Sequence, residues 1–249
     1  MDAADTIRNA VAQVAALRLD AASTPSLHAA TVAIKLFQAN RFSGTYADFL
    51  ASAEYAGAAR FFLEDLYSDK DYSLRDQQFA RIAGALQRLF PQQVVATAVS
   101  LAELHMLTEE LDRQMAAVWM ADLGGRGVFD RASRYVACWR SVGREKDRYR
   151  QLKMMLNAGR ELDRHTRTPG LRLMLKMMRR PASIIGLGSF HRLLESGFDT
   201  FAQMSGKGAR ANEFLRTIEL RESAWIKRLS SGDVPVCVAE LQTCLANVR

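Results

Sequence analysis

The segment 103-ELHMLTEELD-112 places a histidine and two carboxylates on one side of a predicted helix. His105, Glu109 and Asp112 stand at i, i+4 and i+7, a spacing at which side chains share a helix face. An imidazole and carboxylates can bind a metal or transfer protons. A helical di-iron site would need Glu-x-x-His motifs on two helices, and the chain has neither. Since His105 also lies beside an apolar stripe, a hydrogen-bonded boundary histidine is the simpler interpretation.

A second group of carboxylates surrounds a predicted helix–loop–helix corner. Its members are Glu64, Asp65, Asp69, Asp71 and Asp76. Clustered oxygen atoms suit a hard cation, but the spacing lacks the D-x-[DN]-x-[DN]-G pattern and its distal glutamate. Acids near a helix start are also stabilised by the helix dipole without an ion. We expect Lys70 and Arg75 to pair with these acids, and we predict neither a metal nor a catalytic residue. His105, Glu109, Glu64 and Asp65 remain the candidates of an alternative hypothesis.

The segment 171-LRLMLKMMRRPASIIGLG-188 has a basic stripe beside an apolar stripe at helical spacing. Such a helix can lie on an anionic membrane or contact an acidic partner, and methionine-rich faces adapt to varied partners. The alternative is a surface helix with one buried face and solvated arginines, because amphipathic helices in globular domains look the same. The candidate partner- or membrane-binding residues are Arg172, Met174, Lys176, Met178, Arg179 and Arg180.

The other motifs that could bind a cofactor are missing from the sequence. His28, His165 and His191 have no C-x-x-C-H attachment motif for haem. There is no P-loop, no Rossmann glycine fingerprint after a strand, and no G-x-S-x-G elbow. Gly186 and Gly188 follow no predicted strand, so close helix packing explains them better than phosphate binding. We therefore expect no cofactor.

The elements that position these residues are helices. Alanine, leucine, arginine, glutamate and methionine recur, prolines number five, and apolar residues follow the helical period. Thr24-Pro25 and Thr168-Pro169 are typical of an N-cap followed by proline in the first turn. The expected helices cover 3–19, 25–40, 45–50, 53–67, 73–90, 91–121, 129–141, 145–166, 169–180, 182–204 and 211–229, and residues 234–248 could add a short turn or helix.

The cysteine content and the hydropathy of the sequence indicate the cellular compartment. Three cysteines, Cys138, Cys237 and Cys244, are too few and too scattered for a disulfide framework and suit a reducing compartment. Asp2 and Asp5 stand where a secretory signal would carry positive charge. No run of about 18 apolar residues is present. We expect a cytoplasmic protein.

Charge is distributed unevenly along the chain. Residues 1–130 hold 11 Lys and Arg against 16 Asp and Glu, whereas residues 131–249 hold 23 against 11, so the two parts carry −5 and +12 of the total of +7. The basic part could contact an acidic protein, an anionic membrane, nucleic acid or the acidic part of the same chain. Nucleic acid ranks below the others, because no helix-turn-helix or zinc-finger pattern occurs and acids are interspersed.

The segment 61-FFLEDLYSDKDYSLRDQQ-78 is the most distinctive part of the sequence. It has a phenylalanine pair, a Leu–acid–Leu–Tyr run and a downstream Arg-Asp. In these features the chain resembles a family of uncharacterised bacterial proteins without an established activity. The similarity continues through 79-FARIAGALQRLFP-91, 101-LAELHMLTEELD-112 and 195-ESGFDTF-201. The resemblance implies a shared helical fold and supplies no catalytic residue.

The sequence thus predicts an all-α fold of about ten helices, packed as a single bundle-like layered domain over residues 1–249. The glycine-rich stretch near 122–128 is a candidate sub-domain boundary. Our first hypothesis for function is a non-catalytic interaction or regulatory protein that docks an acidic partner through its basic C-terminal half. One alternative is a ligand- or metal-binding helical protein, with or without enzymatic activity, that uses His105 and nearby carboxylates. Another is peripheral membrane association through residues 171–188. The oligomeric state stays open.

Overall fold

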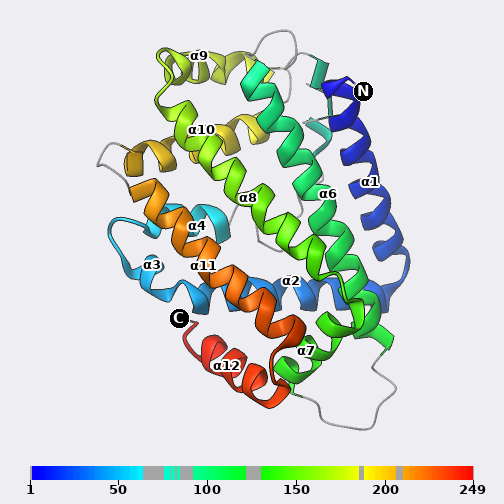
Figure 1. The fold of residues 1–249 in the computed structure, drawn as a ribbon. Coiled ribbons are helices and arrows are strands. Elements are labelled where there is room, and N and C mark those ends of the chain that lie inside the picture. The colour runs from blue at the N-terminus through cyan, green and yellow to red at the C-terminus, as the bar shows by residue number, and fades with distance from the viewer. Residues whose placement is uncertain are drawn as a thin grey trace. The chain divides into compact units, whose positions relative to one another are not determined.

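The computed structural model describes residues 2–63, 76–78, 80–81, 83–84, 92–121, 130–184, 188–205 and 210–248 (Figure 1). Regular structure in this part of the chain is helical throughout, without a β-strand, which confirms the predicted all-α fold class. The helices are α1 (Ala3–Ser23), α2 (Pro25–Thr45), α3 (Ala47–Ala51), α4 (Ala56–Phe61), α6 (Gln92–Ala121), α7 (Arg131–Val142), α8 (Glu145–Thr166), α9 (Leu171–Ile184), α10 (Gly188–Ser205), α11 (Arg210–Ser231) and α12 (Val234–Ala246).

Several helix ends coincide with the signals in the sequence. Helix α8 has the predicted bounds. Gly143, between α7 and α8, has a φ of 63°, in the left-handed region that glycine adopts without a steric penalty at a helix end. Pro25 stands in the first turn of α2, after the N-cap residue Thr24, as predicted; the Thr24 side chain, however, forms no capping hydrogen bond.

Helix α9 starts and ends later than predicted. Gly170 has a φ of 78°, so the helix begins after this residue and not at Pro169. The predicted break at Pro181 is wrong, since α9 continues to Ile184. A proline so close to a helix end removes only one hydrogen bond of the helix, and a final turn can still form.

Contacts between Cα atoms group the chain into two compact units. Unit 1 consists of Met1–Ala15, Lys70–Met106 and Lys153–Thr217, and unit 2 of Ala16–Asp69, Leu107–Leu152 and Ile218–Arg249. The predicted boundary near 122–128 lies outside the described residues and stays a prediction.

Two apolar clusters lie within the described residues of unit 1. In the first, Ile7 packs with Ala83, Ala98 and Ala102. In the second, Leu171 and Leu175 of α9 pack against Phe198 of α10. The second cluster fixes which face of α9 is buried.

The core of unit 2 joins α2, α6, α7, α11 and α12. Its buried members include Ile34, Met115, Tyr135, Trp225 and Leu241. The C-terminal segment forms the full helix α12, whose first turn is capped by the Asp233 side chain accepting the backbone N–H of Val236. Helix α12 packs against α2 and α7 (Figure 1).

Gly44 sets the distance between α2 and α12 within unit 2. A Cβ atom at this position would lie 1.9 Å from the backbone oxygen of Cys244. The two helices therefore touch through their backbones, as only glycine permits.

In the described part of the chain, we find no helix with the length and apolar content that a membrane crossing requires.

Candidate functional site

His105 and Glu109, which the sequence placed on one helix face, have different partners. The His105 Nε2 atom lies 3.1 Å from the Asp76 Oδ2 atom in unit 1. In unit 2, the Glu109 carboxylate accepts hydrogen bonds from Arg18 at 2.9 Å and from Lys35 at 2.7 Å. Burial alone would raise the pKa of Glu109, but these two cations outweigh it and hold the pKa below the ordinary value. Glu109 is thus a fully paired anion.

The acidic corner predicted at 64–76 falls mostly outside the described residues, Glu64, Asp65, Asp69, Lys70, Asp71 and Arg75 included. Asp76 is described and bonds His105. Among the residues that the structure describes, no three His, Cys, Asp or Glu side chains gather as metal ligands would.

Two of the other histidines form ordinary buried hydrogen bonds in unit 1. His165 Nε2 lies 3.3 Å from the Thr97 hydroxyl, and burial lowers the pKa of His165. His191 Nε2 donates to the Leu175 carbonyl oxygen at 2.8 Å. Both contacts are typical of histidines at the edge of a core.

The inner face of α9 packs against α10 in unit 1. Leu171 and Leu175 are buried there, and Met174 packs against the same cluster. Met178 is half-buried. Met174 and Met178, predicted to contact a partner, therefore face partly into unit 1 itself.

The cations of α9 divide into two pairs. Arg172 bonds Asp199 of α10 at 2.9 Å, and Arg179 donates to both oxygens of Glu195 at 2.7 and 2.9 Å. Lys176 and Arg180 are exposed and have no ion-pair partner within the described residues. Helix α9 itself has no acidic residue.

Two large apolar side chains stand beside these cations. Leu173 is 62% exposed and Met177 is 69% exposed. They lie at i and i+4, on the side of the helix opposite the buried leucines. The sequence interpretation missed them, although their spacing was visible, because it assigned only the larger apolar stripe. We define the outer face of α9 as Arg172, Leu173, Lys176, Met177, Arg179 and Arg180.

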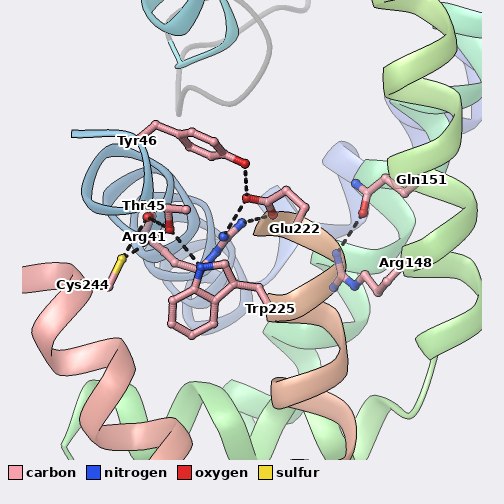
Figure 2. A network of polar contacts seen from close by, with 8 residues as sticks. All are labelled: Arg41, Thr45, Tyr46, Arg148, Gln151, Glu222, Trp225 and Cys244. Atoms are coloured by element: carbon pink, nitrogen blue, oxygen red, sulfur yellow. Dashed lines mark hydrogen bonds and ion pairs between the residues drawn. The ribbon is translucent and has the colours of Figure 1, made fainter. Parts of the chain in front are cut away.

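Unit 2 contains a buried polar cluster that no sequence motif predicted (Figure 2). Arg41 of α2 donates to both oxygens of Glu222 of α11 at 3.0 and 2.8 Å. The Tyr46 hydroxyl donates to the same carboxylate at 3.0 Å. Burial is the largest single influence and acts to lower the pKa of Arg41, but the charge of Glu222, its hydrogen bonds to Arg41 and the nearby Tyr135 and Tyr46 together raise it. This ion pair joins α2 to α11.

A second set of bonds ties the end of α2 to α11 and α12 (Figure 2). The Trp225 indole N–H donates to the Thr45 hydroxyl at 3.0 Å. That hydroxyl donates to the Arg41 carbonyl at 2.8 Å, and the Cys244 thiol donates to the same carbonyl at 3.3 Å. These bonds lie where the end of α2 contacts α12.

Arg148 of α8 is buried with incomplete partners. Its guanidinium stacks 4.5 Å above the Trp139 ring, and Nη1 lies 3.4 Å from the Gln151 side-chain oxygen (Figure 2). Gln151 in turn donates to the Thr108 hydroxyl at 2.8 Å. The Nη2 atom of Arg148 is buried and makes no hydrogen bond in the described part of the chain.

Comparison of the sequence with known proteins identifies the family to which the chain belongs. No curated protein and no solved structure matches it. A family model for a domain of unknown function, DUF8198, matches residues 17–235. Because this match spans most of the sequence, the chain belongs to the DUF8198 family.

Proposed function

We propose that this chain is a non-catalytic helical interaction or regulatory protein of the bacterial cytoplasm, which docks an acidic partner protein through the outer face of α9. The observation that carries the proposal is that exposed cations and exposed apolar side chains lie together on one face of α9. This helix has no acidic residue of its own. Lys176 and Arg180 supply the free charge, and Leu173 and Met177 supply the apolar contact.

Electrostatics supports an acidic partner. Asp199 and Glu195 neutralise Arg172 and Arg179, which holds these two arginines in place against α10. The charges of Lys176 and Arg180 remain to attract carboxylates on a partner, and such attraction raises the rate of encounter.

Apolar burial would supply most of the affinity. Leu173 and Met177 project from the same face as the cations, and burial of each would contribute about 1.5 kcal/mol or more in favourable contact. Methionine adapts to differently shaped surfaces, because its side chain is unbranched and flexible. The expected partner surface is thus an apolar depression with a carboxylate rim.

A protein partner fits this face better than a membrane. Binding to a lipid surface scales with the apolar area that enters the lipid, and Leu171 and Leu175 are already buried against Phe198. Among the described side chains of α9, Leu173 and Met177 are the large apolar ones exposed to enter the lipid. The carboxylate of Asp199, which is partly exposed, would also be repelled by anionic headgroups.

The test is quantitative capture from an extract of the source organism with charge-reversed variants. The double variant Lys176→Glu, Arg180→Glu should reduce recovery of at least one acidic protein by about tenfold or more, since like charges then face each other. The matched control is Lys146→Glu, Arg150→Glu, which reverses an exposed Lys and Arg at the same spacing on α8 and should leave recovery unchanged.

Equal recovery with both double variants would contradict docking at α9. Flotation with phosphatidylglycerol vesicles at low salt tests the alternative, because attraction to an anionic surface is strongest there. Vesicle binding that depends on Lys176 and Arg180, without a captured protein, would replace the proposal with membrane association.

A further inference from the structure

We propose that an open groove of unit 2 binds a free amino acid with an apolar side chain. The groove has a volume of about 420 Å³, which lies within the range of small-molecule sites. It is lined by residues of α11 and α12 and by the last two residues of α2. All of them belong to unit 2, so the site is separate from the outer face of α9 and requires no partner protein.

The first argument is the incomplete pairing of Arg228 on α11. Its Nε atom lies 3.2 Å from the Glu240 Oε2 atom, and its guanidinium carbon lies 5.5 Å from the centre of the Trp225 ring. Neither of its Nη groups has a hydrogen-bond partner within the described residues. Paired N–H donors of a guanidinium match the two oxygens of a carboxylate. Arg228 can therefore bind the carboxylate of a ligand and keep its contact with Glu240.

Arg221, a second cation in the lining of the groove, is already occupied. Its Nη1 and Nη2 atoms donate to the two oxygens of Asp48 at 2.8 and 2.7 Å. The Nη1 atom also donates to the Thr45 carbonyl oxygen at 2.8 Å. Of these two arginines, Arg228 is thus the one with donors left for a ligand.

The second argument is the carboxylate of Glu240 on α12, which lines the same groove. Arg228 contacts its Oε2 atom, whereas Oε1 has no partner within the described residues. A carboxylate oxygen accepts a hydrogen bond from an ammonium group. Donors for a carboxylate and an acceptor for an ammonium group therefore lie side by side. In a free amino acid both groups are attached to one carbon atom, whereas in a peptide the chain separates them.

The apolar wall of the groove belongs to α11. Leu220 is 63% exposed and lies one helical turn before Ala224, and both line the groove together with Trp225. The Trp225 indole N–H donates to the Thr45 hydroxyl at 3.0 Å (Figure 2), which fixes this part of the wall before a ligand arrives. An apolar ligand side chain would cover exposed surface of Leu220, and removal of that surface from water favours binding.

Titration calorimetry of the full chain with L-phenylalanine and two analogues tests the site. The analogue 3-phenylpropionate lacks the ammonium group, and the analogue phenethylamine lacks the carboxylate. We expect saturable binding of L-phenylalanine. Each analogue should bind about tenfold more weakly, because each loses a hydrogen bond to a charged group.

Two variants assign each loss to one residue. Arg228→Met should weaken the binding of L-phenylalanine about tenfold and leave the binding of phenethylamine unchanged. Glu240→Gln should weaken the binding of L-phenylalanine to a similar degree and leave the binding of 3-phenylpropionate unchanged. Since the two side chains are 48% and 41% exposed, neither variant should change the unfolding temperature much. The matched control is Lys227→Met, an exposed cation of α11 outside the groove, which should bind like the wild type.

Three results would overturn the proposal. The first is the absence of saturable binding of L-phenylalanine to the wild type. The second is equal affinity for L-phenylalanine and either analogue, which would leave a simple acid, a simple amine or apolar contact alone as the basis of binding. The third is an equal loss of affinity in Arg228→Met and Lys227→Met, which would place the ligand elsewhere on the chain.

Discussion

Individual charges in unit 2 differ in how far their partners compensate them. Glu109 is held by two cations, and Arg41 and Glu222 neutralise each other through two parallel bonds. Arg148 lies at the other extreme, with an unpaired Nη2 atom in the described structure. Since a buried charge is costly unless paired, these residues should respond very differently to substitution.

Substitution of Glu222 should be among the most damaging changes in the chain. Glu222→Gln leaves the buried Arg41 without its anion and should lower the free energy of unfolding by about 3 to 5 kcal/mol. Urea unfolding measures this loss.

An exposed pair in the same unit provides the control. Arg221 also binds a carboxylate through two bonds, to Asp48, but Asp48 is largely exposed. Asp48→Asn should therefore cost less than about 1 kcal/mol. Equal losses for Glu222→Gln and Asp48→Asn would show that the Arg41–Glu222 pair is no more important to the fold than a surface contact.

Asp112 should make stability depend on pH. Burial raises its pKa above the ordinary value of 3.8, so the folded chain holds this proton more tightly than the unfolded chain does. The tighter binding of this proton in the folded chain adds to the free energy of unfolding. The whole of this contribution is present below pH 3.8, and it is lost as the pH rises through the raised pKa of Asp112. Asp112→Asn keeps the oxygen that accepts from Gln38 and never ionises. We expect the variant to equal the wild type in acid and to exceed it at neutral pH.

Urea unfolding across a pH series checks this expectation for Asp112. If Asp112→Asn were less stable than the wild type at neutral pH, the ionised carboxylate would be stabilising the fold through Lys35 and Arg148.

Among the elements, the helices were predictable from local signals, because capping, glycine and hydrophobic period act within a few residues. Gly143 and the bounds of α8 are examples. Pro181 shows the limit of such signals, since a proline near a helix end does not stop the last turn. The basic residues of the outer face of α9 were predicted from their spacing. Which apolar residues remain exposed depended on α10, which the spacing within α9 does not reveal.

The polar cluster of unit 2 could not be predicted, because its members come from helices far apart in the sequence. Arg41 and Glu222 are separated by 181 positions. The one local hint lies in α2, where Gln38 and Arg41 interrupt a buried face at helical spacing. A polar residue on such a face indicates a buried partner, but its identity depends on the tertiary fold.

Helices α2 and α12 lie so close together at Gly44 that a side chain at this position should destabilise the fold. Gly44→Ala forces a methyl group against the Cys244 backbone and should destabilise the chain by about 1 to 3 kcal/mol, a usual cost of overpacking. Gly84→Ala is the matched control, because a Cβ there meets no atom within 4 Å. Since the backbone of Gly84 is helical, this substitution should stabilise the chain by about 0.5 to 1 kcal/mol. Thermal unfolding of both variants measures the difference, and a neutral Gly44→Ala would contradict the backbone contact.

At the scale of the whole molecule, part of the charge asymmetry is satisfied inside the chain. In unit 2, Arg144 pairs with Glu110 and Arg221 pairs with Asp48, so cations of the basic C-terminal part meet acids of the N-terminal part. In unit 1, Lys176 and Arg180 lack such partners within the described residues. Lys176 and Arg180 are thus part of a wider exposed positive charge in the basic half, which also includes Lys146 and Arg150 of α8.

Site-specific photo-crosslinking tests the docking of a partner at α9 most directly. A benzoylphenylalanine at Met177 is compared with the same residue at Leu220, an equally exposed apolar position in unit 2 (69% and 63% exposed). We expect adducts with an acidic protein from Met177 only, lost when Lys176 and Arg180 are both changed to glutamate. Equal adducts from the two positions, or adducts from Leu220 alone, would contradict α9 as the docking surface.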